Sequence, residues 1–360
     1  MKKVLSVLLI AVLMLSLFSA CGGSTESAAP ESEAPASAAP ESETPESAVT
    51  ESESPESSGW VPTQQVELII PASAGGATDL LARAVESVWT KYCDQPVVIT
   101  NMGGGGGVTG AMAVASADPD GYTLELGYGS GHDMCMMYLQ ELEYDPFTML
   151  EPVCCMSVHT AGVVAPIDSE FESMADVAAW SEANPNTPVS VSVSTANGTA
   201  DLTMQAVRYY TGINMSIVPH DGGGPAMTDL LSGAYMIGCG HPAEFYTYVQ
   251  SGQMKVLGIA SDERDPTFPD IPTLKEQGIE FSSYGSIKGV AVPVGTPQEI
   301  KDYYEELFRQ ISEDPEFQET MASMAQPVMY MDTEEFTQYF YNANQSNKTM
   351  IEDLGLAYYE

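Results

Sequence analysis

The residues best suited to chemistry lie in three short loops of glycine and small polar side chains. Residues 73–78 follow an apolar segment at 66–70, residues 195–199 follow an alternating segment at 189–194, and residues 220–224 form the third loop. Each loop precedes a stretch with helical periodicity. The first backbone N–H groups of a helix have no partner within it, and the helix dipole places positive charge there. The pattern therefore predicts an anion site built from backbone amides.

The elements that must position these loops alternate between strand and helix. After the strand at 66–70, Leu81, Val85, Val88 and Trp89 recur at helical spacing, which predicts a helix with one buried face. Similar alternation continues along the chain, and this order favours parallel sheets with crossover helices, an α/β fold. Glycine loops at the carboxyl ends of such strands are expected to face one crevice.

The N-terminal segment is typical of an exported lipoprotein. Lys2 and Lys3 precede an apolar run at 4–18 that is too short to span a membrane, and small residues lead to Cys21. Residues 18–21 resemble a lipobox, which implies a signal peptide at 1–20 and acylation of Cys21. A plain secretory signal with a chance cysteine is the alternative.

Residues 21–59 consist almost entirely of Ser, Glu, Pro, Ala, Thr and Gly, with PESE occurring twice. This composition cannot bury enough apolar surface to offset the entropy of ordering, so it predicts a disordered acidic tether. The remaining chain is long enough for two domains. We place lobe 1 at 60–160 and 285–360, and lobe 2 at 161–284.

The charge of the remaining chain argues against some partners. Without the nine Glu of the tether and the two lysines of the signal, 41 acidic residues stand against 10 basic ones. Nucleic acid and anionic lipid surfaces are therefore poor partners. Beyond Cys21 the chain has five cysteines, an odd number, which favours buried free thiols over a complete disulfide framework.

Several blocks of the sequence together resemble one family. They are, in order, PASAGGATDLLAR, QPVVITNMGGGGGVTGAMAVASADPDGYTLELG, STANGTADL, VPHDGGGPAMTDLLSG, FPDIPTLKEQGIEF and GVAVPVGTP. These blocks resemble the extracytoplasmic solute receptors of tripartite tricarboxylate transporters, the Bug or TctC-like family, over roughly residues 66–356. The resemblance implies a two-lobed type II periplasmic-binding-protein fold, each lobe a mostly parallel sheet flanked by helices. It also implies a small carboxylate ligand and delivery to a membrane permease.

The resemblance and the loop pattern together predict which residues bind the ligand. In that family backbone amides of the first and second loops hold the ligand, and Asp79 matches a residue expected to fix the loop rather than touch the ligand. The predicted ligand-binding residues are Ser73, Ala74, Gly75, Gly76, Ala77, Thr78, Tyr128, Gly129, Ser130, Thr195, Asn197, Gly198, Thr199, His220 and Gly222. His220 and Asp221 stand where the family usually has a tyrosine, which leaves the ligand's size and charge open. Lys288 is open between ligand contact and solvation.

A dinucleotide site is the first rival interpretation. Gly105, Gly107 and Gly110 fit GxGxxG between a strand and a helix, but the downstream acid, Glu125, falls within a strand rather than at its end. The alternative reading of these glycines is close packing of helix and strand.

Enzymatic and metal sites are the other rivals. Ser130 fails the nucleophile-elbow pattern because Tyr128 occupies the required glycine position. His132, Asp133 and Cys135 could be metal ligands, yet no second cluster has ligand spacing. We therefore predict no catalytic residue, no metal and no cofactor.

The sequence thus predicts a receptor, lipid-anchored on the outer face of the cell membrane, that captures a small organic carboxylate such as a di- or tricarboxylate. Its predicted partners are the ligand, the permease subunits of a tripartite tricarboxylate transporter and, through the anchor only, the membrane. A surface sensor or adhesion module that kept the binding fold is the alternative, and an exported enzyme is a third hypothesis.

Overall fold

The computed structural model describes residues 59–280 and 285–359. The predicted signal peptide, Cys21 and the tether, apart from Gly59, lie outside these residues. In the described ranges no helix combines the length and apolar character needed to cross a membrane.

The first of two five-stranded sheets has the order β2-β1-β3-β10-β4. Its strands are β1 (Val66–Ile70), β2 (Val97–Asn101), β3 (Thr123–Tyr128), β4 (Leu150–His159) and β10 (Ser286–Pro293). Strands β2, β1 and β3 are parallel, whereas β10 runs antiparallel to both β3 and β4. A single antiparallel strand is therefore inserted into an otherwise parallel sheet.

The second sheet repeats this arrangement with the order β7-β6-β8-β5-β9. Its strands are β5 (Ala161–Pro166), β6 (Val189–Val193), β7 (Met215–Pro219), β8 (Ile237–Gly240) and β9 (Met254–Ala260). Strands β7, β6 and β8 are parallel, and β5 is antiparallel to β8 and β9. The predicted two-lobed α/β fold with mostly parallel sheets is confirmed, whereas the exact lobe boundaries stay a prediction.

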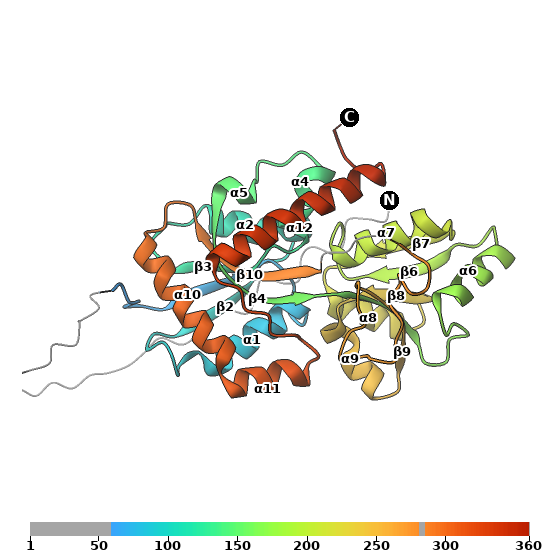
Figure 1. Ribbon diagram of the computed structural model, residues 1–360, viewed down its shortest axis with the longest axis horizontal. Coiled ribbons are helices and arrows are strands. Elements are labelled where there is room, and N and C mark those ends of the chain that lie inside the picture. The colour runs from blue at the N-terminus through green and yellow to red at the C-terminus, as the bar shows by residue number, and fades with distance from the viewer. Residues whose placement is uncertain (1–58, 281–284, 360) are drawn as a thin grey trace, which may run out of the picture. The chain divides into compact units, whose positions relative to one another are not determined.

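Helices cover both faces of each sheet (Figure 1). On one face of the first sheet lie α1 (Ala77–Trp89), α10 (Gln298–Glu313) and α11 (Pro315–Ser323). On its other face lie η1 (Gly105–Gly107), α2 (Val108–Ala115), α3 (Gly131–Met134), α4 (Met136–Leu139), α5 (Pro146–Met149) and α12 (Thr333–Asp353). The second sheet packs against α6 (Met174–Ala183) and α7 (Thr199–Thr211) on one face, and against α8 (Gly223–Leu231) and α9 (Pro242–Gln250) on the other.

Helix α1 shows how the apolar pattern fixes an element in place. Leu81, Val85 and Val88 are fully buried against the first sheet, and the Trp89 ring packs edge-on against Phe308 of α10 with centroids 6.0 Å apart. Burying apolar side chains of this size contributes roughly 1.5–3 kcal/mol each. The start of α1 is therefore held firmly at the end of β1.

The chain passes between the sheets twice. The first passage is short, because only Thr160 separates β4 from β5. The apolar stretch at 153–166 therefore contributes to one strand of each sheet. The second passage runs from the end of β9, at Ala260, to the start of β10, at Ser286.

Candidate functional site

The N-termini of helices that pack against the two sheets converge on one cavity of about 130 Å³. Its lining includes the starts of α1, α3, α7, α8 and α9 and the loop before α2. The lining residues are Pro71, Ala72, Ser73, Gly76, Ala77, Thr78, Gly103, Gly104, Gly106, Gly107, Gly127, Ser130, Gly131, His132, Ser194, Thr195, Ala196, Gly198, Thr199, Ala200, His220, Asp221, Gly222, Gly223, His241, Glu244, Ser286 and Lys288.

The amides at the starts of α1 and α7 are available to a ligand. Gly76 and Gly198 are the N-caps, and neither helix has a side-chain cap. Within the described residues, the N–H groups of 77–79 and of 199–201 donate no hydrogen bond. Such unpaired amides with the positive ends of two helix dipoles behind them favour an anion.

Three aspartates hold the loops before α1, α3 and α7 in the same way. The N–H of Gly75 donates to Asp79 Oδ2 at 2.8 Å, and that of Gly129 to Asp133 Oδ2 at 2.7 Å. In the second lobe Asn197 N–H donates to Asp201 Oδ2 at 2.8 Å. Gly75, Gly129 and Asn197 all have positive φ, at 80°, 88° and 58°. The loop-fixing role predicted for Asp79 is confirmed, and it recurs twice.

The two lobes meet through glycines. A Cβ added at Gly131 would lie 2.8 Å from Gly198 Cα of the other lobe, and a Cβ added at Gly222 would lie 3.3 Å from Ser73 Cβ. The first distance is shorter than any real side chain tolerates. Glycine at position 131 therefore permits the close approach of the start of α3 to the start of α7.

Most of the predicted site residues line this cavity. The residues brought together are Ser73, Gly76, Ala77, Thr78, Ser130, Thr195, Gly198, Thr199, His220 and Gly222. Ala74 and Gly75 lie at the exposed apex of the first loop, outside the lining. The N–H groups of Gly75, Gly129 and Asn197 already bind aspartates, so we assign these three residues to loop positioning.

Tyr128 does not form the wall of the cavity as predicted. Its side chain is buried in the core of the first lobe, with its ring 4.9 Å from that of Phe340 and its hydroxyl donating to the Pro146 carbonyl at 3.1 Å. The expectation placed Tyr128 with Ser130 in a loop after a strand at 123–126, but β3 continues to Tyr128. The side chain instead points into the helical layer formed by α5 and α12.

In the third loop, both ring nitrogens of His220 contact residues of the same lobe. His220 Nε2 lies 3.1 Å from Asp229 Oδ2, and Nδ1 lies 3.3 Å from the Val193 carbonyl oxygen. Gly222, with φ 119°, caps α8, and its N–H donates to the Ser194 carbonyl at 2.7 Å. Pro225 stands at the third helical position, because the helix begins at Gly223.

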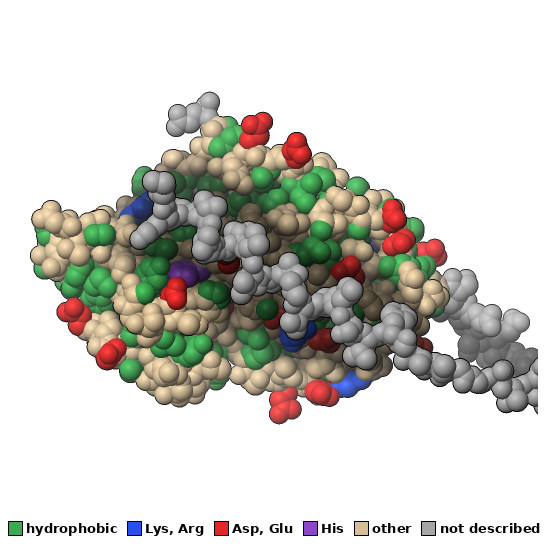
Figure 2. All heavy atoms as spheres, turned by 180° about the vertical axis from the view of Figure 1, so that it is seen from behind, with side chains coloured by type: hydrophobic (Ala, Val, Ile, Leu, Met, Phe, Trp, Pro, Cys, Tyr) green, Lys and Arg blue, Asp and Glu red, His purple; other side chains and the backbone are tan. Residues whose placement is uncertain are grey.

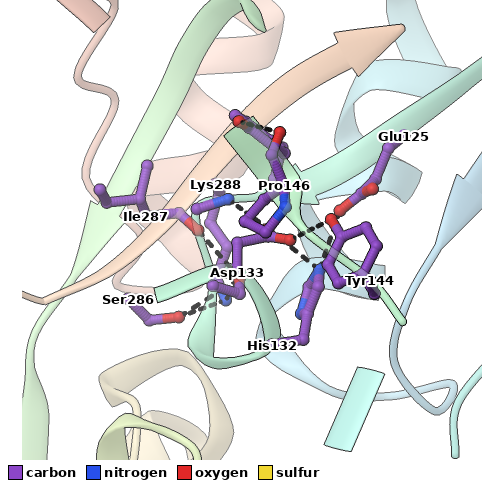
Figure 3. A network of polar contacts seen from close by, with 11 residues as sticks. Glu125, His132, Asp133, Tyr144, Pro146, Ser286, Ile287 and Lys288 are labelled. Carbon is purple, nitrogen blue, oxygen red and sulfur yellow. Dashed lines mark hydrogen bonds and ion pairs between the residues drawn. The ribbon is translucent and has the colours of Figure 1, made fainter. Parts of the chain in front are cut away.

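A buried polar network supports the loop before α3 (Figure 3). His132 Nε2 lies 2.9 Å from Glu125 Oε1 and 3.1 Å from Asp133 Oδ2, and the Tyr144 hydroxyl donates to Asp133 Oδ1 at 2.5 Å. Burial raises the pKa of Glu125 to about 8 and that of Asp133 to about 7, and it lowers the pKa of His132. The two carboxyl groups therefore hold protons that they would lose in water, whereas the neutral form of the His132 ring is favoured.

The metal alternative named His132, Asp133 and Cys135, but the structure brings Glu125 rather than Cys135 beside the other two. The ligand atoms of Glu125, His132 and Asp133 lie within 4.8 Å of one another, close enough to share an ion. Both oxygens of Asp133 already accept hydrogen bonds, from Tyr144 and from Gly129. We therefore assign the cluster to positioning of the loop.

Two glycines of the dinucleotide alternative, Gly107 and Gly110, have a packing role. A Cβ at Gly110 would lie 2.7 Å from the Met102 carbonyl oxygen and 2.9 Å from Pro71 Cα. Gly107 lines the cavity with its neighbours and packs against the His132 ring.

Sequence reasoning left Lys288 open between ligand contact and solvation, and it missed the other polar residues at this side of the cavity. Lys288 and Ser286 come from β10, Glu244 and His241 from the start of α9, and Ser194 from the end of β6. Lys288 is only 3% exposed. One signal was available, because a single lysine interrupts the apolar strand SIKGVAVP.

This architecture, two α/β lobes with a small amide-lined cavity between them, is that of a two-lobed solute receptor. Residues 81–356 match the family described as "Tripartite tricarboxylate transporter family receptor", TctC. The Cupriavidus necator protein named "UPF0065 protein in gbd 5'region" is 30% identical over 82% of this chain and 89% of its own length. The chain therefore belongs to the TctC family of receptors.

Solved structures agree with this assignment. The periplasmic binding protein BugD is 26% identical with a TM-score of 0.76, and the match covers 82% of this chain and 99% of that chain. MatC (Rpa3494) from Rhodopseudomonas palustris with bound malate has the same fold at 24% identity, with a TM-score of 0.73 and coverage of 81% and 99%.

Proposed function

We propose that this protein is an extracytoplasmic receptor that captures a small organic carboxylate between its lobes. The observation that carries the proposal is the pairing of two helix N-termini, those of α1 and α7, whose first amides are unpaired and line one cavity. A carboxylate oxygen accepting such N–H groups replaces the water lost on closure, and the exclusion of water strengthens each hydrogen bond.

The relatives support the ligand class. The family is named for a tricarboxylate transporter receptor, and MatC was solved with malate. By this analogy the liganded, closed form is what a membrane permease would recognise. Anchoring through acylated Cys21 belongs to the same proposal, because the lipobox-like sequence would hold the receptor at the outer face of the membrane.

A titration with a carboxylate panel tests the proposal. Purified protein is mixed with mono-, di- and tricarboxylates, aromatic carboxylates and amino acids, and the unfolding temperature and the heat of binding are measured. At least one carboxylate should bind saturably and raise the unfolding temperature, as expected when a ligand binds only the folded state. Absence of binding by every compound would contradict the proposal.

Substitutions then test whether the loops act through their backbones. Gly76→Val and Gly198→Val place bulk at the two N-caps, where φ is near −80° and a side chain is conformationally allowed. Both variants should fold and lose binding. Ala74→Val, in the same loop but exposed and outside the cavity, is the matched control and should bind normally. Unchanged affinity in both glycine variants would refute the assignment.

A further inference from the structure

Lys288 is a buried cation whose charge has no anionic partner. Its Nζ donates to Ser286 Oγ at 2.8 Å and to Ser130 Oγ at 3.1 Å. Across the described part of the chain, no carboxylate lies within ion-pair distance of this Nζ. An ammonium group has three N–H donors, so one of them remains for a group in the cavity.

The neighbouring ionisable groups do not replace this partner. Glu244 Oε2 accepts from Ser194 Oγ at 2.7 Å and from His241 N–H at 2.9 Å, which holds this carboxylate at the start of α9. It acts on Lys288 only through its field, which favours the charged form. Two histidines face the same region, and burial lowers the pKa of both His241 and His159. Lys288 is therefore the full positive charge at this side of the cavity.

Burying a charge without an ionic partner costs free energy, and at Lys288 this cost disfavours the protonated form. Burial lowers the pKa of Lys288 from 10.5 to about 8. A negatively charged group brought beside Nζ would offset the desolvation and restore the ordinary preference for the charged form. The position of Lys288 in the cavity lining makes a bound ligand the available source of that group.

We propose that Lys288 binds a second acidic group of the ligand, so that the cavity selects dianionic metabolites over monocarboxylates. The inference rests on the proposed function, in which the amides of α1 and α7 hold the first carboxylate. Those amides carry partial charges that can accommodate one carboxylate without a cation. A monocarboxylate seated there would leave the ammonium of Lys288 unpaired, whereas a dicarboxylate would satisfy both.

Matched ligand pairs test the proposal. Succinate is compared with butyrate, and adipate with hexanoate, because each pair differs by one carboxylate on the same carbon chain. Calorimetry is performed on the wild type, Lys288→Met and Lys288→Arg. Since hydrogen bonds to charged groups contribute about 1.5–3 kcal/mol, Lys288→Met should weaken dicarboxylate binding about 10- to 100-fold and leave the monocarboxylate nearly unchanged. Lys288→Arg should retain part of the selectivity.

The number of protons taken up on ligand binding provides a second readout. A purely structural role of Lys288 would leave this number unchanged. At pH 8 the dicarboxylate should bind with uptake of protons by the wild type, seen as a binding heat that depends on the ionisation enthalpy of the buffer. Lys288→Met should show no such uptake. Lys255→Met is the control, because Lys255 pairs with Glu172 outside the cavity.

The outcomes separate the two proposals. Equal loss of mono- and dicarboxylate binding in Lys288→Met would mean that Lys288 serves the first carboxylate, which overturns the inference but not the receptor function. Equal affinity of the wild type for both members of each pair would also overturn it. Binding of neither member of either pair would overturn the inference, whereas the receptor function fails only if no compound of the wider carboxylate panel binds.

Discussion

Glu125 is a carboxyl group whose ionisation is controlled by burial alone. It is fully enclosed, one of its oxygens faces His132, and the other has no hydrogen-bond partner in the described part of the chain. With no cation to compensate it, the neutral form is favoured, and the pKa rises to about 8. The folded protein therefore retains a proton that the unfolded chain releases near pH 4.5.

This difference predicts the effect of Glu125→Gln. Between pH 4.5 and about 8 the folded state binds more protons than the unfolded state, so the contribution of Glu125 to stability is complete below pH 4.5 and is lost as the pH rises to about 8. Glutamine has no proton to lose. The unfolding temperature of the variant relative to the wild type should therefore be higher at pH 8 than at pH 5.5.

Thermal unfolding at the two pH values checks this expectation, with the exposed Glu141→Gln as control. The lowered pKa of His132 acts in the opposite direction, because the unfolded chain binds the extra proton below pH 6.5. That contribution is common to wild type and variant to a first approximation. A difference that does not change with pH would contradict the prediction.

The limits of sequence reasoning at this scale have a physical cause. Lys288 and Ser130 are in contact although 158 positions separate them, and nothing local to either residue indicates the other. Tyr128 was misplaced because β3 is buried on both faces, so its alternation does not show which side chains face the cavity. The aspartates of the loops lie only four residues from their amides, and Asp79 could be assigned correctly.

Among the elements, the contact between the starts of α3 and α7 governs closure of the lobes. Gly131→Ala would place a methyl group 2.8 Å from Gly198 Cα, where the structure has no room. Overpacking of this kind costs about 1–3 kcal/mol. The lobes should be kept apart, and the affinity for any bound carboxylate should fall about tenfold or more while the unliganded protein stays folded.

Calorimetry and the radius of gyration by X-ray scattering, each with and without ligand, measure this effect. Gly224→Ala is the matched control, because a Cβ there meets only the Gly75 carbonyl oxygen at 4.0 Å, an ordinary contact. If Gly131→Ala binds and contracts like the control, the glycine contact does not limit closure.

The strand and helix pattern could be predicted because each element carries its own signal. The last helix is an example, because the Asp332 side chain at its N-cap accepts the Glu335 N–H at 2.9 Å. The sheet order could not be read in this way. The insertion of β10 between β3 and β4 depends on a strand that follows the whole second sheet in the chain.

At the scale of the whole molecule, the excess of acidic side chains affects the stability of the folded state. The chain has 50 acidic and 12 basic residues, and Figure 2 shows acidic side chains spread over the face that it displays. Self-repulsion of this kind destabilises the compact state, and salt screens it. The unfolding temperature should therefore rise as NaCl is increased from about 0.01 M to about 0.15 M, over which the Debye length falls from about 30 Å to about 8 Å.

Differential scanning calorimetry without ligand measures this rise. KCl should give the same increase as NaCl, because screening depends on ionic strength and not on the identity of the cation. A flat or falling unfolding temperature would show that repulsion among surface carboxylates contributes little to the stability of the folded chain.

The five buried cysteines described here have a practical consequence. None is in a disulfide, four lie in the first lobe and Cys239 lies in β8 of the second. Burial raises the pKa of Cys135 and Cys155 to about 12, so an alkylating reagent reacts only after the surrounding structure opens. The rate of modification at each position, followed by mass spectrometry, would therefore report local opening on either side of the cavity without an introduced label.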